Sequence, residues 1–231
     1  MLTLIIILKI LAPFSTKANY CYSALLGLLK KIPVVQKFFP LLSFFFLAFS
    51  IEAQTLRHEY NIIKQKEIIG SLTATKKHLS EGFSITIDSR TSISILIDFI
   101  VNVYQFNKYQ DGKLTDALFI QSLNGRRKVH NTVQWGLNGY TVEKDGQKIS
   151  LNNDINYSVA SMYFEEPVSI QKVFSENQLT VLSLHKLSNH CYELQLPDGK
   201  TNYYSYRDGM LVHARLSTRF TTVELILKES K

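Results

Sequence analysis

Three glutamates in the second half of the chain have the clearest capacity for acid–base chemistry. Glu165 and Glu166 are adjacent, and Glu176 follows within the same stretch. General acid–base catalysis by carboxyl groups requires two acids in different environments at a fixed separation. Adjacent glutamates do not establish that geometry, and a local cap or salt bridge explains Glu165 better, with Glu166 solvated. We therefore predict no catalytic residue and keep a carboxylate-dependent hydrolase as an alternative.

The histidines and cysteines lack a metal or nucleophile motif. None of the six histidines forms H-x-x-x-H or H-E-x-x-H. An extended strand would place His185 and His190 on opposite faces. We interpret Cys191 as a small, partly buried hydrophobe, because only the adjacent His190 would support a nucleophile. The sequence also contains no phosphate-binding glycine loop and no G-x-S-x-G elbow. We predict no metal site and no cofactor.

Aromatic side chains are the most informative group for binding. Several of them gather within and just after residues 156–165, and the only tryptophan, Trp135, precedes them. Ligand pockets are concave and mostly apolar, with a few polar groups. Ordinary core packing is the competing explanation, since aromatics bury the largest areas. The residues we predict to contact a ligand are Tyr157, Tyr163, Phe164, Glu165, Phe174, Glu176 and Trp135.

Glycine placement and alternation indicate the elements that must position these residues. Six of the ten glycines follow Asp or Asn, as in type I′ hairpin turns. Between the turns, apolar and polar residues alternate, for example along 83–88 and 191–196, with period two. The fold class predicted is mainly β, a single curved antiparallel meander forming a half-open barrel or clam. Strands are expected near 57–64, 67–76, 82–89, 92–107, 114–123, 127–136, 139–143, 147–150, 179–186, 190–196, 201–207, 210–217 and 219–228.

One segment departs from this pattern. Residues 156–165 are predicted to form a short helix, with Asn156 as its cap and Pro167 ending it. Val159, Met162 and Tyr163 would share one helical face. Such a helix would plug the open side of the curved sheet, and the stretch 168–177 after it is expected to be irregular.

The N-terminal region resembles an export signal. Residues 34–53 combine Lys37, a short apolar stretch and Ala53 before a polar segment, which is typical of a signal peptide. The apolar stretch is shorter than the roughly 20 residues of a bilayer span, and an uncleaved membrane anchor is the alternative. Residues 1–33 are interpreted as an over-extended start or an extra apolar leader. The sequence thus predicts an exported β-domain, 54–231, in the periplasm or cell envelope.

The positive charge lies largely outside that domain. Of the net +7, residues 1–53 carry five lysines against Glu52 alone. The remaining cations are scattered, whereas nucleic-acid-binding proteins concentrate them on one face among stacking aromatics. We therefore expect no nucleic-acid partner, and membrane contact only through the N-terminal segment.

Four motifs together resemble an uncharacterised exported β-sheet family of Gram-negative bacteria, known as a domain of unknown function. They are 69–76 (IGSLTATK), 156–167 (NYSVASMYFEEP), 173–176 (VFSE) and 196–200 (LPDGK). The segment Ser158–Phe164 is also distantly similar to a larger periplasmic domain-of-unknown-function family built on a curved β-sheet. The resemblance covers about residues 57–228 and implies a secreted β-fold. It implies no activity and no catalytic residues.

We predict from these features that the protein binds a hydrophobic or amphipathic ligand, such as a lipid or an envelope intermediate, without catalysis. An envelope structural or adaptor protein that binds other proteins is the first alternative. The carboxylate-dependent hydrolase is the second. The sequence leaves the oligomeric state open.

Overall fold

In a computed structural model that describes residues 55–94, 98–144, 146–152, 154–218 and 221–228, alternating strand segments pair into one antiparallel sheet. The elements are β1 (Thr55–Lys64), β2 (Glu67–His78), β3 (Phe83–Ser94), β4 (Asp98–Gln110), β5 (Lys113–Leu123), β6 (Arg126–Gly136), β7 (Gly139–Lys144), β8 (Gln147–Leu151), the 3₁₀ helix η1 (Ser161–Tyr163), β9 (Lys172–Ser175), β10 (Thr180–Ser188), β11 (Cys191–Gln195), β12 (Thr201–Arg207), β13 (Met210–Ser217) and β14 (Thr222–Leu227). These residues belong to one compact unit, Ala53–Lys231. The predicted leader, 1–33, and signal peptide, 34–53, lie outside the described residues.

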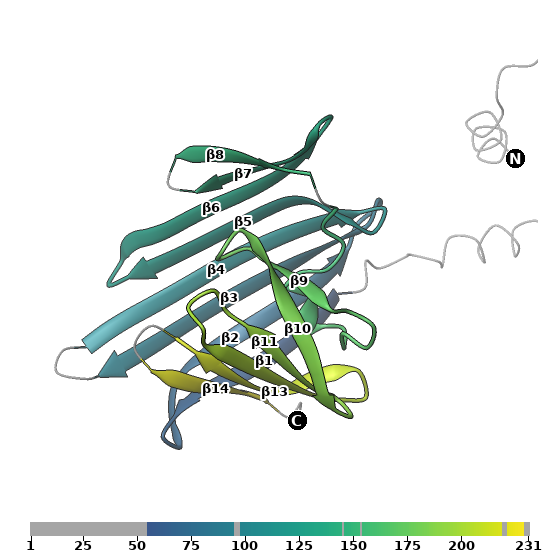
Figure 1. The fold of residues 1–231 in the computed structure, drawn as a ribbon. Coiled ribbons are helices and arrows are strands. Elements are labelled where there is room, and N and C mark those ends of the chain that lie inside the picture. The colour runs from purple at the N-terminus through teal and green to yellow at the C-terminus, as the bar shows by residue number, and fades with distance from the viewer. Residues whose placement is uncertain (1–54, 95–97, 145, 153, 219–220, 229–231) are drawn as a thin grey trace, which may run out of the picture. The chain divides into compact units, whose positions relative to one another are not determined.

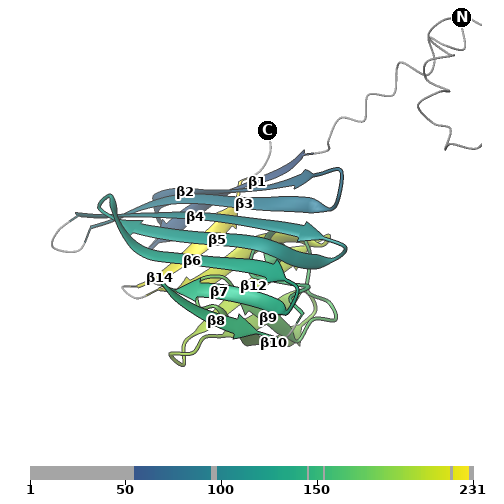
Figure 2. The ribbon, with the colours of Figure 1, turned by 90° about the horizontal axis from the view of Figure 1, so that it is seen from above.

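The strand order shows an open meander that folds back on itself. It runs β8-β7-β6-β5-β4-β3-β2-β1-β14-β13-β12-β11-β10-β9, so β1 pairs with β14 and the edges are β8 and β9. Figures 1 and 2 show β1–β8 side by side, with the C-terminal strands continuing from β1. The two edges are not paired with each other, and the sheet stays open between them. The prediction of a single curved antiparallel meander that is not closed is confirmed.

Alternation produces a buried inner face. On β1, Tyr60 and Ile62 are buried, whereas Asn61 between them is only partly covered. The adjacent residues Tyr203 and Tyr204 of β12 likewise separate, with Tyr204 buried and Tyr203 exposed. Buried side chains from the N-terminal strands and from the C-terminal strands pack together in one hydrophobic core. Within the described residues, no helix is long and apolar enough to span a bilayer.

One predicted turn is misplaced. The sequence suggested a turn near residue 90 and a long strand over 92–107, but β3 continues to Ser94, and Ser94 pairs with Asp98 at the start of β4. The connecting residues 95–97 are Ile-Leu-Ile. Because they contain none of the usual turn residues, the apolar run concealed the reversal.

The predicted helix is much shorter than 156–165. Only Ser161–Tyr163 is helical, and its N-cap, Ala160, makes no side-chain capping bond. The expected cap, Asn156, is exposed, and Ser158 forms a parallel bridge with Phe174. That bridge is possible because 172–175, expected to be irregular, forms β9. Extended pairing with β9 therefore replaces the first half of the predicted helix.

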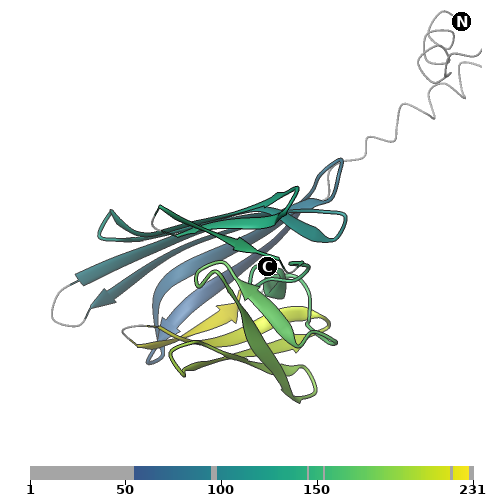
Figure 3. The ribbon, with the colours of Figure 1, turned by 45° about the horizontal axis from the view of Figure 1, so that its top comes forward.

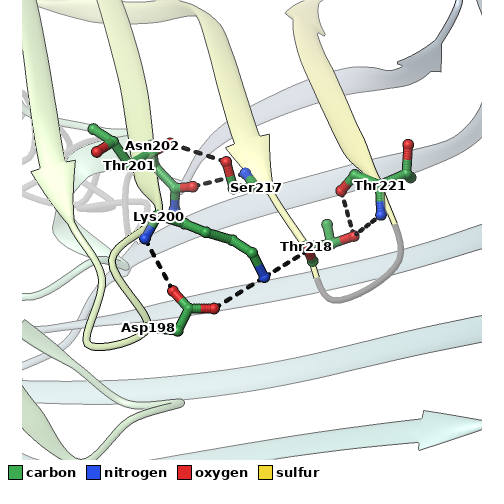
Figure 4. Close-up of polar contacts among 7 residues, drawn as sticks. All are labelled: Asp198, Lys200, Thr201, Asn202, Ser217, Thr218 and Thr221. Atoms are coloured by element: carbon green, nitrogen blue, oxygen red, sulfur yellow. Dashed lines mark hydrogen bonds and ion pairs between the residues drawn. The ribbon is translucent and has the colours of Figure 1, made fainter.

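Polar contacts close one end of the C-terminal strands (Figure 4). Asp198 turns the chain between β11 and β12, and its carboxylate lies 3.0 Å from the Lys200 ammonium. The Lys200 Nζ donates to the Thr218 carbonyl at 3.3 Å, and the Ser217 amide donates to Asn202 Oδ1 at 2.8 Å. This exposed ion pair contributes little stability. The contacts instead fix how the β11–β12 turn meets the end of β13.

Gly70 of the 69–76 motif makes a close contact between β2 and β3. A Cβ at this position would collide with the Arg90 carbonyl oxygen and lie 2.8 Å from the Thr91 Cα. Gly70→Ala is therefore expected to lower the free energy of unfolding by roughly 1–3 kcal/mol, as overpacking does. Gly136→Ala is the matched control, since its nearest neighbour would be 3.8 Å away. Urea denaturation measures both, and equal stabilities of the two variants would contradict the close approach.

Candidate ligand-binding site

The segment between β8 and β9, residues 154–171, crosses the open side of the sheet, and we name it the strap (Figure 3). On one side, the Leu114 amide of β5 donates to the Ile155 carbonyl at 2.8 Å. On the other side, the Tyr206 hydroxyl of β12 donates to the Met162 carbonyl at 2.9 Å. His58 Nδ1 of β1 lies 2.9 Å from the Tyr163 carbonyl. The strap is therefore held by strands from both halves of the sheet.

A buried polar cluster joins the strap to the inner face of β4. Asn107 Nδ2 donates to Glu176 Oε1 at 2.6 Å, and the Tyr109 hydroxyl donates to Ser158 Oγ at 2.8 Å. The Tyr109 hydroxyl also lies 3.0 Å from Ser161 Oγ. All five side chains are at most 7% exposed. Since buried polar groups are costly without partners, this network fixes where the strap sits against β4.

Burial governs the ionisation of this cluster. It raises the pKa of Glu176 above its usual 4.5, because the carboxylate form loses hydration, although hydrogen bonds from Ser158 and Asn107 partly offset the rise. Burial, together with the charge of Glu176, also raises the pKa of Tyr109. The cluster thus favours a neutral carboxyl group inside the core.

The residues predicted to bind a ligand are placed in three different environments. Tyr157, Tyr163, Phe174 and Glu176 are brought together, and each is at most 9% exposed. They belong to one packed core around the strap, with the Tyr163 ring against Tyr60 at 5.7 Å. Core packing, the competing explanation, accounts for their present contacts.

The other three predicted residues lie apart from that group. The Phe164 ring is half-buried and stacks on His58 at 4.9 Å, and Glu165 is exposed. Trp135 is 41% exposed and packs on Tyr140 at the end of β6, with its ring centroid 4.7 Å away. Glu165 is exposed to solvent whereas Glu176 is enclosed in the core, so the two carboxyl groups do not line one open site. The hydrolase alternative gains no support from this arrangement.

Sequence reasoning missed a second carboxylate centre at Glu166. Its Oε2 lies 2.9 Å from His190 Nδ1, and the Tyr192 hydroxyl donates to its Oε1 at 2.7 Å. Burial would raise the pKa of Glu166, but the hydrogen bonds from His190 and Tyr192 outweigh it and lower the pKa. Burial and the neighbouring Glu166 raise the pKa of Tyr192 to about 12. Glu166 thereby attaches the strap to the β10–β11 turn. Within the described residues, no three His, Cys, Asp or Glu side chains are grouped to hold a metal ion.

Beyond the strap, the inner face carries apolar residues that are only half-buried. Val103 lies on the same face as buried Gln105 and pairs with Gln121, which in turn pairs with Val129 of β6. Val101 pairs with Leu123 of β5. Figure 3 shows the hairpin ends of β3–β6 extending past the C-terminal strands. We name Val101, Val103, Leu123 and Val129 the inner apolar patch.

The inner apolar patch borders an unsatisfied polar atom. Asn131, two residues from Val129 on β6, donates through Nδ2 to the carbonyls of Glu176 and Asn177 at 2.9 and 2.7 Å. Its Oδ1 is buried and has no partner among the described residues. An unpaired buried acceptor costs about 1–3 kcal/mol. This end of the inner face therefore combines half-buried apolar side chains with an acceptor that lacks a donor.

Taken together, the fold and this site define an open, single-sheet antiparallel β protein with a strap across its opening. The sequence model of a family described as domain of unknown function DUF6134 matches residues 60–228. The chain belongs to that family. The resemblance to a domain of unknown function, inferred from the four motifs, is confirmed at that level. Its exported, Gram-negative character stays a prediction.

No curated protein sequence matches the chain. Among solved structures, it is similar to the beta-barrel-like protein of domain of unknown function DUF1849 from Brucella abortus, with 12% sequence identity and a TM-score of 0.45. That match covers 77% of this chain and 96% of the other chain.

Proposed function

We propose that this protein is exported to the periplasm or cell envelope and binds a hydrophobic or amphipathic molecule, such as a lipid or envelope intermediate, without catalysis. The half-buried inner apolar patch carries this proposal. Elsewhere on the same face, under the strap, apolar side chains are fully buried. Covering the patch would bury further apolar surface, at about 25 cal/mol per Å².

Polar groups beside the patch favour an amphipathic ligand over a purely apolar one. Asn131 Oδ1 lacks a donor, and the half-buried Gln121 lies between Val103 and Val129. A hydroxyl or amide of the ligand could donate to the half-buried Gln121 side chain while its apolar part covers the valines. Since the aromatic residues around the strap are already packed against one another, the proposed site is this patch and not the Tyr157–Tyr163 group.

Val103→Asp tests the proposal, because a carboxylate on the patch would have to be desolvated by an apolar ligand. Lipids are extracted from the purified full-length protein and quantified by mass spectrometry. The wild type is expected to carry a reproducible species, and Val103→Asp to retain at least about ten-fold less, a change of 1.4 kcal/mol in binding.

Asn102→Asp is the matched control. It adds the same charge one residue earlier, on the opposite face of β4. This variant is expected to retain the wild-type amount of lipid. Wild-type protein that is consistently free of lipid, or equal losses in the two variants, would refute ligand binding on the inner face.

A further inference from the structure

The edge of the sheet at β10 is only partly covered. β9 pairs with Thr180–Ser183, whereas β10 continues to Ser188. β11 pairs with the other side of β10. In the described part of the chain, no strand lies beside β10 on its β9 side after residue 184. The second half of β10 therefore has a neighbouring strand on its β11 side only, and its other side is a free strand edge.

The backbone groups of Lys186 face this edge. The Leu184 amide donates toward the β9 side, to the Gln171 carbonyl at 2.9 Å. Backbone groups alternate in direction along an antiparallel strand, so those of Lys186 point to the same side, and those of His185 point toward β11. Lys186 thus presents an amide and a carbonyl to a partner that would lie along the line of β9.

A depression of about 510 Å³ occupies this position. It is lined by residues 168–171 of the strap and Lys172 of β9 on one side, and by Ser183–Lys186 of β10 on the other. Pockets of about 300–1,000 Å³ are typical of ligand sites. The depression therefore has room for a short extended segment between the strap and β10.

The strap is held in a shape that keeps it from pairing here. The Val168 amide donates to the Glu166 carbonyl at 2.9 Å, and the Ile170 amide donates to the Pro167 carbonyl at 3.3 Å. These contacts fold the backbone of Glu166–Ile170 into turns, so this part of the strap is not extended alongside β10. Glu166 is in turn fixed to His190 and Tyr192. The strap consequently forms a wall of the depression instead of filling it.

We propose that this edge binds an extended acidic peptide segment of a partner protein, which adds as a strand to β10 beside Lys186. Strand addition obtains affinity from main-chain hydrogen bonds and specificity from alternate side chains. Lys172 and Lys186 border the depression and attract carboxylates. Val168 and Ile170 offer apolar contacts to the alternate side chains. This inference goes beyond the proposed lipid binding and uses a different surface.

The charged groups around the edge agree with an acidic occupant. Glu166 is a strap residue beside this wall, and its carboxylate contacts His190 and Tyr192 and also attracts the Lys186 ammonium. Glu193 of β11 lies opposite His185 of β10 in the sheet. Lys186 lies on the face of buried Leu184, with its Nζ 6.0 Å from the Tyr192 ring centroid, whereas Lys172 pairs with Ser183 on the opposite face. Carboxylates on the two faces of an added strand would therefore each meet one ammonium group.

Fluorescence anisotropy with the full-length protein tests the inference, using a fluorescein-labelled peptide of alternating Glu and Val, six residues long. Saturable binding that weakens with added salt is expected. Lys186→Pro removes the amide that faces the peptide but no β11 hydrogen bond, and proline is tolerated at strand edges. It should weaken binding at least about ten-fold, an effect equivalent to roughly one lost hydrogen bond.

Lys186→Gln is the matched variant, since it keeps the amide and removes only the charge. It should weaken binding less than Lys186→Pro and reduce the salt dependence. If Lys186→Pro fails to fold, a peptide methylated on its backbone nitrogens replaces it and should bind at least ten-fold more weakly to the wild type. An alternating Lys and Val peptide should bind more weakly than the Glu and Val peptide.

Three results would overturn the inference. The first is that the wild type shows no saturable binding at 1 mM peptide, on the order of the weakest specific contacts. The second is that Lys186→Pro binds the Glu and Val peptide as tightly as the wild type does. The third is that the wild type binds the Lys and Val peptide as tightly as the Glu and Val peptide. Val103→Asp should leave peptide binding unchanged, and Lys186→Pro should leave lipid recovery unchanged. Failure of one proposal is thereby distinguished from failure of the other.

Discussion

Met162→Ala is expected to lower the free energy of unfolding by about 2–5 kcal/mol, the range for truncating a large buried side chain to alanine. Met162 is the middle residue of η1 and is fully buried. Its side chain packs in the core that the strap shares with both halves of the sheet. Because the Tyr206 hydroxyl donates to the Met162 carbonyl, the surrounding backbone is held and the cavity cannot collapse easily.

Such a loss is a large share of the 5–15 kcal/mol that stabilises a typical domain. Urea denaturation followed by tyrosine and tryptophan fluorescence measures the change, with an unchanged dependence on urea concentration indicating the same folded state. Leu137→Ala is the control, because Leu137 is fully exposed at the β6–β7 turn, and it should change stability by less than about 0.5 kcal/mol. A Met162→Ala effect as small as that of the control would show that the strap does not pack into the core.

Glu176→Ala is expected to cost roughly 2–5 kcal/mol, because it leaves a cavity and removes the acceptor of the buried Asn107 amide. Glu176→Gln keeps an acceptor of similar shape and should cost much less. Comparing the two by urea denaturation separates the loss of the hydrogen bond and volume from the loss of the ionisable group.

The pH dependence gives a second result for Glu176. Its pKa is raised in the folded protein above the usual 4.5, so the folded state holds the proton more tightly than the unfolded state does. The stabilisation is fully present below the unfolded pKa and is lost as the pH rises through the folded pKa. Glu176→Gln cannot release this proton. Its stability relative to the wild type should therefore rise as the pH increases from the unfolded pKa, near 4.5, to the folded pKa, and level off above it.

Glu165→Gln is the matched control for that titration, since Glu165 is an exposed glutamate of the same strap. As a substitution of an exposed side chain, it should change stability by less than about 0.5 kcal/mol. Parallel pH profiles for the wild type and Glu176→Gln would contradict a buried, proton-holding carboxyl group. Chemical denaturation at several fixed pH values provides the comparison.

Most of the sheet was predictable because its signals are local. Type I′ hairpin turns require positive φ at both central residues, which Asp-Gly and Asn-Gly pairs tolerate. Alternation over five or six residues marks a half-buried strand. The turns at Asp111-Gly112, Asn124-Gly125 and Asp208-Gly209 all adopt such angles. The reversal after Ser94 was not predicted because the residues that follow it are apolar. Strand β9 was not predicted because it is only four residues long.

The polar cluster left a weaker signal. Gln105, Asn107 and Tyr109 alternate along β4, so they share one face with Val101 and Val103. Polar residues at the inward positions of an otherwise apolar strand indicate a buried network. Which carboxyl group would join that network could not be inferred, because Glu165, Glu166 and Glu176 look alike in the sequence. Only folding separates one exposed glutamate, one paired with His190 and one enclosed beside Asn107.

The sequence by itself thus determined an antiparallel β-sheet, most of its turns and the aromatic content of its core, since each depends on neighbouring residues. The tertiary structure decided the pairing of β1 with β14, the position of the strap and the identity of the uncovered edge at β10. The Tyr60–Leu211 and Asn107–Glu176 contacts join residues 151 and 69 positions apart. Contacts over such separations depend on how the whole chain packs, and no local pattern encodes them.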